Sequence, residues 1–171
     1  GSVATDVART LLRLKVASVT LACAEGQCEM PAFGWELAEA EREGVKFIHS
    51  ASPVRIGGDW QKVQWVEFDP VTRFAVGECG IECETNRAGR FRAETDMVVF
   101  AVGQSPDRGV FENTPGIETN ERGRIRMDPD TRMTTRDGVF LAGDIAEAKG
   151  SVVEAVASAR LVSVANRHAV G

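Results

Sequence analysis

The sequence predicts an α/β fold, in which a parallel sheet carries helices and an antiparallel meander is inserted into it. Three observations support this class. Residues 1–48 alternate in the order helix, strand, helix, strand. Residues 52–92 change to short strands joined by turns. Near the C-terminus, an apolar run at 139–142 ends in Gly143-Asp144 and leads into a helix that begins with a strong cap.

The first residues have a helical pattern with no strand before them. Four apolar residues share one face at helical spacing, namely Val3, Val7, Leu11 and Leu14. The segment Ser18–Cys23 that follows is rich in β-formers and apolar residues and is typical of a strand. A helix and then a strand is the back half of a βαβ unit, so the first unit is incomplete and we expect the chain to be a fragment.

A second helix and a second strand follow. Phe33, Leu37 and Ala40 fall at helical spacing, and Gly44 suits the position just after a helix. Residues Val45–Ile48 then form the next predicted strand. This segment favours a parallel sheet with helices packed on it.

Residues 52–92 are predicted to form the inserted meander. The runs 53–56 and 63–68 flank Gly57-Gly58-Asp59 and predict a hairpin, and shorter strands follow at 74–76 and 90–92. The run from Glu94 to Gly103 is continuously apolar at its centre, which predicts a return to the parallel sheet as a buried strand.

The segment from Val139 to Val153 predicts a strand, an acid at its tip and a helix start. Val139–Ala142 is predicted to be a buried parallel strand that ends at Gly143-Asp144. Ser151 with Glu154 three residues later forms a capping box. The N–H groups at such a helix start attract an anion, and the Asp144 carboxylate can accept hydrogen bonds from the hydroxyls of a sugar or ribityl chain.

Composition excludes several classes of protein. The chain has 171 residues, 43% of them hydrophobic, with a formal net charge of −5, which argues against a nucleic-acid partner. No apolar run approaches the ~20 residues that span a bilayer, and no signal peptide is visible. Its four cysteines suggest a reducing compartment, so we expect a cytoplasmic protein without a membrane span.

Several segments resemble, in the same order, the pyridine-nucleotide-dependent flavoprotein reductases, and most closely the glutamate synthase small (beta) subunit and its relatives. Gly138-Val-Phe-Leu-Ala-Gly-Asp144, followed by the helix start at Ser151, looks like their second FAD motif. Glu29-Met-Pro-Ala32 and Glu41-Arg-Glu-Gly-Val-Lys-Phe47 also match the family, and residues 101–107 resemble its Gly-Gln-x-Pro turn. The resemblance implies a Rossmann-like sheet in a three-layer β/β/α arrangement.

The resemblance also implies the domains. Residues 1–104 would be the NAD(P)-binding domain without its first strand, and residues 105–171 the C-terminal segment of the FAD-binding domain. The parent protein would transfer hydride from NAD(P)H to FAD, and electrons onward to iron–sulfur clusters or a partner subunit, without a catalytic protein residue or a resident metal. The chain alone would be inactive, and its exposed half-sites favour a homodimer.

Ten residues are the expected cofactor contacts. Gly1 and Ala4 match the last Gly and the Ala of the nucleotide fingerprint, unless Gly1-Ser2 is a cloning scar. Glu25 lies 21 residues after Ala4, where an acid binds the adenosine ribose. The others belong to the turn toward the cofactors and to the second FAD motif, namely Gly103, Gln104, Gly143, Asp144, Ser151, Val152 and Val153.

NADH is favoured over NADPH. NADPH-using relatives resemble each other in carrying two arginines at about Ala24 and Glu25, whereas this sequence has no arginine between Lys15 and Arg42. A 2′-phosphate would therefore meet Glu25 with no local cation. The alternative is that Glu25 is an ordinary solvated loop residue.

A second hypothesis belongs to another class of protein. The chain would be a non-catalytic Rossmann-like interaction domain with a cysteine-based redox sensor. Cys79 and Cys83 have the wrong spacing for a dithiol or zinc motif, and Cys23 and Cys28 flank the expected ribose loop.

Overall fold

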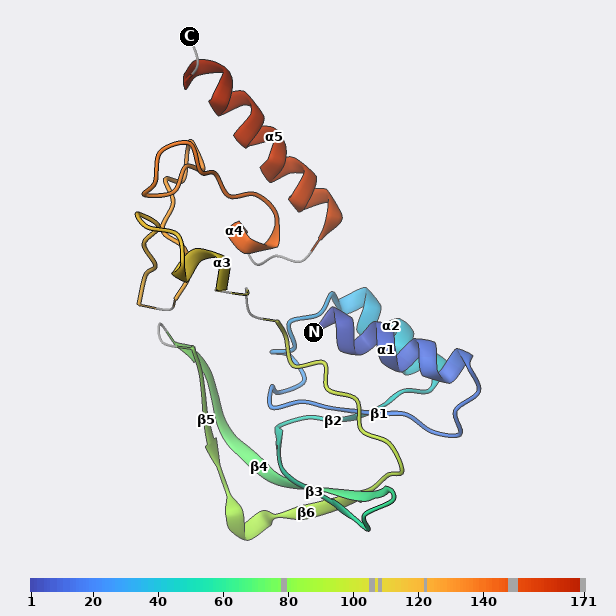
Figure 1. Ribbon diagram of the computed structural model, residues 1–171. Helices are drawn as coiled ribbons and strands as arrows, with labels where there is room; N and C mark the ends of the chain where they lie inside the picture. Colours follow the sequence, from blue (N-terminus) through green and yellow to red (C-terminus); the bar gives the residue numbers. More distant parts are fainter. Residues whose placement is uncertain (78–79, 105–106, 108, 122, 148–150, 170–171) are drawn as a thin grey trace. The chain divides into compact units, whose positions relative to one another are not determined.

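The computed structural model describes residues 1–77, 80–104, 107, 109–121, 123–147 and 151–169 (Figure 1). The chain forms two compact units, Gly1–Gly103 and Gln104–Gly171. Within the described residues, no helix has both the length and the apolar character needed to cross a membrane.

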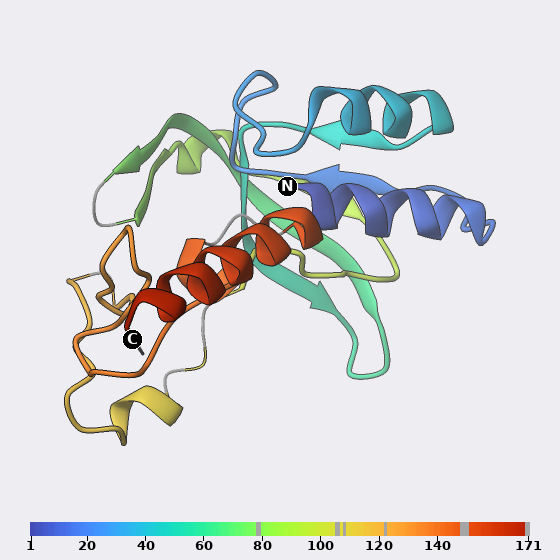
Figure 2. The ribbon, with the colours of Figure 1, turned by 90° about the horizontal axis from the view of Figure 1, so that it is seen from above.

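The first unit begins with the predicted helix–strand–helix–strand order. Its elements are α1 (Ser2–Arg13), β1 (Thr20–Ala22), α2 (Gly34–Glu43) and β2 (Lys46–Ile48). Strands β1 and β2 pair in parallel, with Leu21 opposite Phe47. Figure 2 shows α1 and α2 side by side, both running away from the end of the unit where the chain begins. This part of the prediction is confirmed.

Small residues let the two helices pack closely. Thr5 and Ala8 of α1 and Ala40 of α2 are all buried. Around them, Leu21, Met30 and Val45 complete one core cluster with Ala8 and Ala40. The second helix ends at Gly44, whose φ of +101° is left-handed, as its position after the helical pattern predicts.

The inserted meander is also confirmed, although the strands predicted at 63–68 and 74–76 are one continuous strand. It consists of β3 (Ala51–Gly58), β4 (Val63–Gly77), β5 (Gly80–Thr85) and β6 (Phe91–Glu94), with a short 3₁₀ helix, η1 (Arg87–Gly89), before β6. The long strand β4 pairs antiparallel with each of the other three. Ala51 of β3 and Val66 and Phe68 of β4 form a second core cluster.

Two buried carboxylates hold the arginines of the meander. Arg90 donates to Asp69 through both Nε and Nη2, at 2.6 and 2.9 Å, and Arg92 Nε donates to Glu67 at 2.9 Å. These hydrogen bonds, stronger than the opposing effect of burial, hold the pKa of both carboxyl groups below its ordinary value. The charges are therefore satisfied within the sheet.

The second unit has little regular structure besides its last helix. Its helices are α3 (Gly109–Glu112), α4 (Asp144–Glu147) and α5 (Val152–Ala169). Isolated antiparallel bridges join Thr119 to Ile125, Met127 to Thr134 and Met133 to Phe140.

The predicted buried strand over residues 94–103 is wrong. Strand β6 ends at Glu94, residues 95–103 are not a strand, and the side chains of Met97 and Phe100 are exposed. The backbone of Thr95 still donates to Gln64 O at 3.0 Å, but no described strand continues the ladder beyond it. An apolar run forms a strand only where a neighbouring strand accepts its hydrogen bonds.

The predicted parallel strand over Val139–Ala142 is also wrong. The Thr134 N–H donates to Val139 O at 2.8 Å, and the Leu141 N–H donates to Arg132 O at 2.9 Å, so this segment pairs antiparallel with the one before it. The turn includes Gly138, whose φ is +77°. Leu141 is buried as expected, but its hydrogen-bond partner is local in sequence.

A Gly57→Ala substitution is expected to destabilise the meander. A Cβ at this position would lie 2.1 Å from Trp65 Cζ2, and the Trp65 ring is itself held by the Arg55 and Arg92 guanidinium groups at 4.9 and 4.0 Å. Overpacking of this kind typically costs about 1–3 kcal/mol, which urea unfolding measures. Gly34→Ala is the control, because its Cβ meets nothing within 4 Å and the substitution leaves stability equal or slightly higher.

Acid is expected to weaken the first unit through Glu43. Hydrogen bonds from Arg9 and Arg13 lower the pKa of the Glu43 carboxyl to about 2. A carboxyl whose pKa is lower in the folded state stabilises the fold above its unfolded pKa of ~4.3 and loses that contribution as the pH falls toward 2. Unfolding free energy measured by urea should therefore fall between pH 5 and pH 3.

The variant Arg9→Gln should show a smaller fall over the same pH range. Arg73→Gln is its control, because the Arg73–Glu84 pair is exposed on both sides. An equal pH dependence in the wild type and Arg9→Gln would contradict this assignment.

Candidate functional site

The starts of α1 and α2 meet at the carboxyl end of β1. The Ser2 hydroxyl at the start of α1 donates to Glu36 Oε2 in the first turn of α2, at 2.6 Å. The loop between β1 and α2 also lies close to the start of α1. A Cβ added to Gly1 would be 3.4 Å from Pro31 O in this loop. Two helix N-termini therefore share one edge of the parallel pair, the edge where open α/β sheets bind ligands (Figure 2).

Gly1 and Ala4 form the first turn of α1. Gly1 precedes the helix, and its carbonyl accepts the N–H groups of Ala4 and Thr5 at 3.0 and 3.3 Å. Ala4 is half-buried against the core cluster of this unit. Gly1 has no side chain that could cap the helix. The N–H groups at the start of α1 therefore remain available to an anion.

Glu25 follows the carboxyl end of β1 and is half-buried. Its carbonyl accepts the Ser50 N–H at 3.0 Å and the Cys23 thiol at 3.5 Å, which fixes the backbone of the loop. Among the described residues, no hydrogen bond or ion pair engages its carboxylate. Glu25 is therefore held in place at the edge with an unpaired negative charge.

Cys23 lies next to this acid and is poorly ionised. Burial, and then the negative charge of Glu25, raises the pKa of the Cys23 thiol to about 11. Its sulfur lies 3.7 Å from His49 Nδ1. A reactive cysteine needs a lowered pKa, so Cys23 has the opposite of the environment that a redox sensor requires.

The other cysteines do not assemble a site. Cys28 and Cys83 are exposed free thiols, and Cys79 lies outside the described residues. Across the part of the chain that is described, no three histidine, cysteine or acidic residues are placed to hold a metal ion.

Gly103 and Gln104 mark the junction between the units. Gly103 has a left-handed φ of +94°, a conformation that favours glycine. Both residues are exposed, and Ser105 and Pro106 of the same predicted turn lie outside the described residues.

In the second unit, Gly143 and Asp144 connect the local bridge to α4. Gly143 has a φ of +74°, and its N–H donates to the Ser158 hydroxyl of α5 at 2.7 Å. Ser158 is buried and donates onward to Ala155 O at 2.9 Å. Asp144 is exposed at the first position of α4. Sequence reasoning missed Ser158, and no sequence signal sets it apart from Ser163 of the same helix.

The start of α5 confirms the predicted capping box. The Ser151 hydroxyl donates to Glu154 Oε2 at 2.8 Å and accepts the Glu154 N–H at 3.2 Å. Val152 and Val153 begin the helix, and their side chains are exposed. The apolar side chains at the start of α5 are therefore uncovered.

The ten predicted residues thus fall into two groups and a junction. Gly1, Ala4 and Glu25 share the carboxyl edge of the first unit. In the second unit, Gly143 is hydrogen-bonded to Ser158 of α5, and Asp144 follows it in the chain. No cofactor contact is tested by these distances, so the roles of these residues stay predictions.

Comparison with known proteins gives a family match over residues 1–168, to the model described as pyridine nucleotide-disulphide oxidoreductase. The β subunit of NADP(+)-dependent formate dehydrogenase from Moorella thermoacetica is 32% identical, over 96% of this chain and 23% of that protein. The glutamate synthase [NADPH] small chain from Halomonas elongata is 32% identical, over 94% of this chain and 34% of that protein.

Another relative is the NAD-dependent dihydropyrimidine dehydrogenase subunit PreT from Salmonella typhimurium, 29% identical over 98% of this chain and 35% of that protein. Among solved structures, the Lactococcus lactis thioredoxin reductase superposes with a TM-score of 0.74 at 23% identity, over 95% of this chain and 48% of that one. That likeness confirms the predicted fold class. The chain spans a quarter to a third of the length of its curated relatives.

Cys23 is expected to react more slowly with iodoacetamide at pH 8 than Cys28. A pKa near 11 leaves little of its thiol as the reactive thiolate, and the side chain is half-buried. Peptide mass spectrometry over time should show Cys23 modified at least about tenfold more slowly than Cys28. In urea, iodoacetamide should modify Cys23 and Cys28 at equal rates. Equal rates in the native chain as well would contradict the protected environment described for Cys23.

Proposed function

This chain belongs to the pyridine nucleotide-disulphide oxidoreductase family, and we propose that it supplies the nicotinamide-dinucleotide site and the closing FAD segment of a longer flavoprotein oxidoreductase. One observation carries the proposal: the start of α1 and the unpaired Glu25 lie at the same carboxyl edge of β1. The domain assignment expected from the sequence, with residues 1–104 for the dinucleotide and 105–171 for FAD, is part of this proposal.

The residues of the first unit fit a dinucleotide. A pyrophosphate needs close access to backbone N–H groups. Gly1 has no side chain beside those of the first turn of α1, and a Cβ there would lie 3.4 Å from Pro31 O. The Glu25 carboxylate accepts hydrogen bonds from the ribose hydroxyls. Gly103 and Gln104 lie in the turn that leads toward the cofactors.

The residues of the second unit fit the ribityl and phosphate end of FAD. Asp144 is exposed and accepts hydrogen bonds from ribityl hydroxyls. The backbone N–H groups from Ser151 to Val153 face an anionic or polar edge of the flavin cofactor. The Gly143–Ser158 hydrogen bond holds the Asp144 turn against α5.

The bound cofactors supply the chemistry, which is hydride transfer from NAD(P)H to FAD and electron transfer onward to an iron–sulfur domain or partner subunit. The protein binds and orients them, and no protein residue acts as an acid or base. Since the chain spans only part of its relatives, we propose that the chain alone is inactive and that its uncovered faces favour a homodimer. A cytoplasmic location, expected from cysteine usage, stays a prediction.

NADH is the preferred dinucleotide in this proposal. The relatives' names include both NADPH and NAD, so the family does not decide the question. Glu25 favours NADH because its carboxylate is unpaired and repels a 2′-phosphate. The alternative, a non-catalytic domain with a cysteine sensor, has less support because Cys23 has a raised pKa.

Calorimetric titration of the chain with NADH, NADPH and FAD tests this function. NADH should bind more tightly than NADPH, and Glu25→Gln should weaken NADH binding about tenfold, since a hydrogen bond to a charged group is lost. Glu41→Gln is the matched control, because it removes the same charge from an exposed position on α2. Its affinities should equal those of the wild type.

Three outcomes would count against the proposal. Tighter binding of NADPH than NADH would overturn the cofactor preference. No binding of either dinucleotide would remove the proposed site from this chain. Micromolar binding of FAD would contradict the assignment of only a closing segment of the FAD site.

A further inference from the structure

We propose that the meander binds a small polyanion, a molecule that carries carboxylate or phosphate groups, on the face opposite its core cluster. The site is a hollow of about 540 Å³ that β3, β4, β5 and the segment around η1 line together. Ligand sites in proteins are typically about 300–1,000 Å³, so the hollow has room for a molecule of metabolite size. The inference concerns the meander alone and does not rest on the proposed function.

The alternation of side chains along β4 separates the two faces of the meander. Val66 and Phe68 belong to the core cluster, whereas Glu67 between them lines the hollow on the opposite face. The strand register then places Arg55 of β3 and Arg92 of β6 on either side of Glu67. One polar face therefore gathers side chains from strands on both sides of β4 (Figure 1).

Arginines engage both carboxylates of this face. Arg55 Nε lies 3.3 Å from Glu67 Oε2, and Arg92 Nε donates to Glu67 Oε1 at 2.9 Å. Arg90 donates to both oxygens of Asp69. Each of these three guanidinium groups keeps further N–H groups that have no hydrogen-bond acceptor among the described residues, so these donors remain for a ligand.

Arg87 adds a fourth positive charge without a partner of its own. Its side chain is exposed and lines the hollow, and within the described part of the chain no hydrogen bond or ion pair engages it. The pKa of the Asp69 carboxyl is lowered mainly by the hydrogen bond from Arg90, and also by the charges of Arg90 and Arg87. The four named guanidinium groups thus face two ionised carboxylates, an excess of two positive charges.

The excess charge and the neighbouring hydroxyl groups fit an oxyanion. Guanidinium groups bind carboxylate and phosphate oxygens through paired N–H donors, and they stay charged at every physiological pH. The hydroxyls of Ser52 and Thr85 line the same hollow, and neither has a hydrogen-bond partner in the described structure. An apolar ligand would leave all of these donors unsatisfied, and a cation would be repelled by the arginines.

Trp65 holds two of the arginines in place before any ligand binds. The Cζ atoms of Arg55 and Arg92 lie 4.9 and 4.0 Å from the centroid of the Trp65 ring. The cation–π contacts and the ion pairs with Glu67 restrict both side chains from two sides. Such a preorganised site loses less side-chain entropy on binding than freely mobile surface arginines would lose.

Calorimetric titration of the chain with citrate and with inorganic pyrophosphate tests this site. The probe that binds more tightly identifies carboxylate or phosphate as the ligand chemistry. Arg87→Gln should weaken binding of that probe about tenfold, because a hydrogen bond between charged groups is lost. Since Arg87 pairs with no other described side chain, the substitution leaves the contacts within the meander intact.

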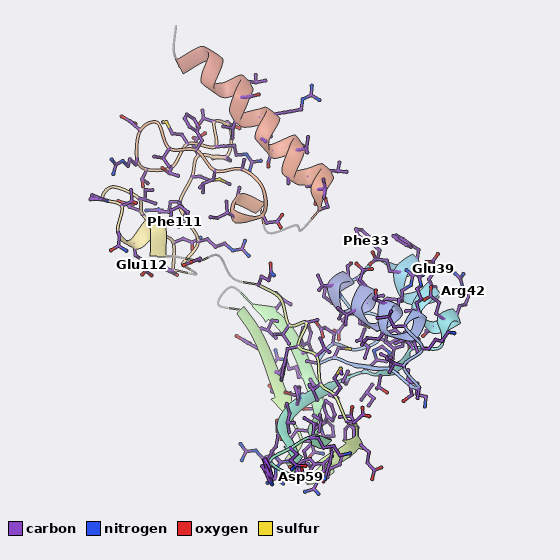
Figure 3. The ribbon with its side chains drawn as sticks, turned by 45° about the vertical axis from the view of Figure 1, so that its right-hand side comes forward. Phe33, Glu39, Arg42, Asp59, Phe111 and Glu112 are labelled. Carbon is purple, nitrogen blue, oxygen red and sulfur yellow. The ribbon has the colours of Figure 1, made fainter. Side chains whose placement is uncertain are left out.

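Arg42→Gln is the matched control. It removes the same charge from an exposed position on α2, and Figure 3 shows Arg42 in the helical part of the first unit rather than in the meander. Its affinity for the probe should equal that of the wild type.

Chemical modification gives a second readout that locates the site. Phenylglyoxal modifies accessible guanidinium groups, and peptide mass spectrometry follows each arginine separately. A saturating concentration of the probe should slow the modification of Arg55 and Arg87 severalfold and leave that of Arg42 unchanged.

Three results would overturn the inference. One is that neither probe binds at millimolar concentration. Another is equal affinity in the wild type and Arg87→Gln, which would place the anion elsewhere, such as the first turn of α1. The third is an equal loss in Arg87→Gln and Arg42→Gln, which would indicate attraction by overall charge alone. NADH binding is measured separately, so its failure would count against the proposed function and leave the anion site standing.

Discussion

The close packing of α1 on α2 is the constraint on which the first unit depends. Thr5, Ala8 and Ala40 are small enough to bring the two helices side by side, and larger side chains at these positions would force them apart. Parallel helices in contact must start at the same edge of the sheet. The Ser2–Glu36 hydrogen bond between the two helix starts follows from that packing.

Hydrogen bonds and ion pairs also join the elements of the first unit. The Ser2–Glu36 hydrogen bond joins the two helix starts, and the Arg9–Glu43 pair joins the two helices farther along. In the meander, Glu67 and Asp69 are buried, but arginines satisfy both carboxylates. Arginines therefore compensate the buried carboxylates of the meander, whereas the buried Glu36 at the shared edge of the helices accepts the Ser2 hydroxyl.

The uncovered apolar residues have a common explanation. Met97 and Phe100 of the first unit are exposed although their pattern predicts burial, and Val152 and Val153 of the second unit are exposed at the start of α5. An apolar pattern predicts that a segment is buried, but it does not predict which other segment packs against it.

The sequence by itself determined the order of helices and strands in the first unit, the meander, the Gly44 helix end and the Ser151 capping box. These features depend on local periodicity and on hydrogen bonds between residues close in sequence. Only the tertiary structure decided the pairing of Val139–Ala142, the absence of a strand over residues 95–103, the raised pKa of Cys23 and the hydrogen bonds of Ser158 and Glu36. Except for the pairing of Val139–Ala142, whose partner is local in sequence, these features depend on which groups of other segments supply partners and exclude water, and no local pattern encodes that information.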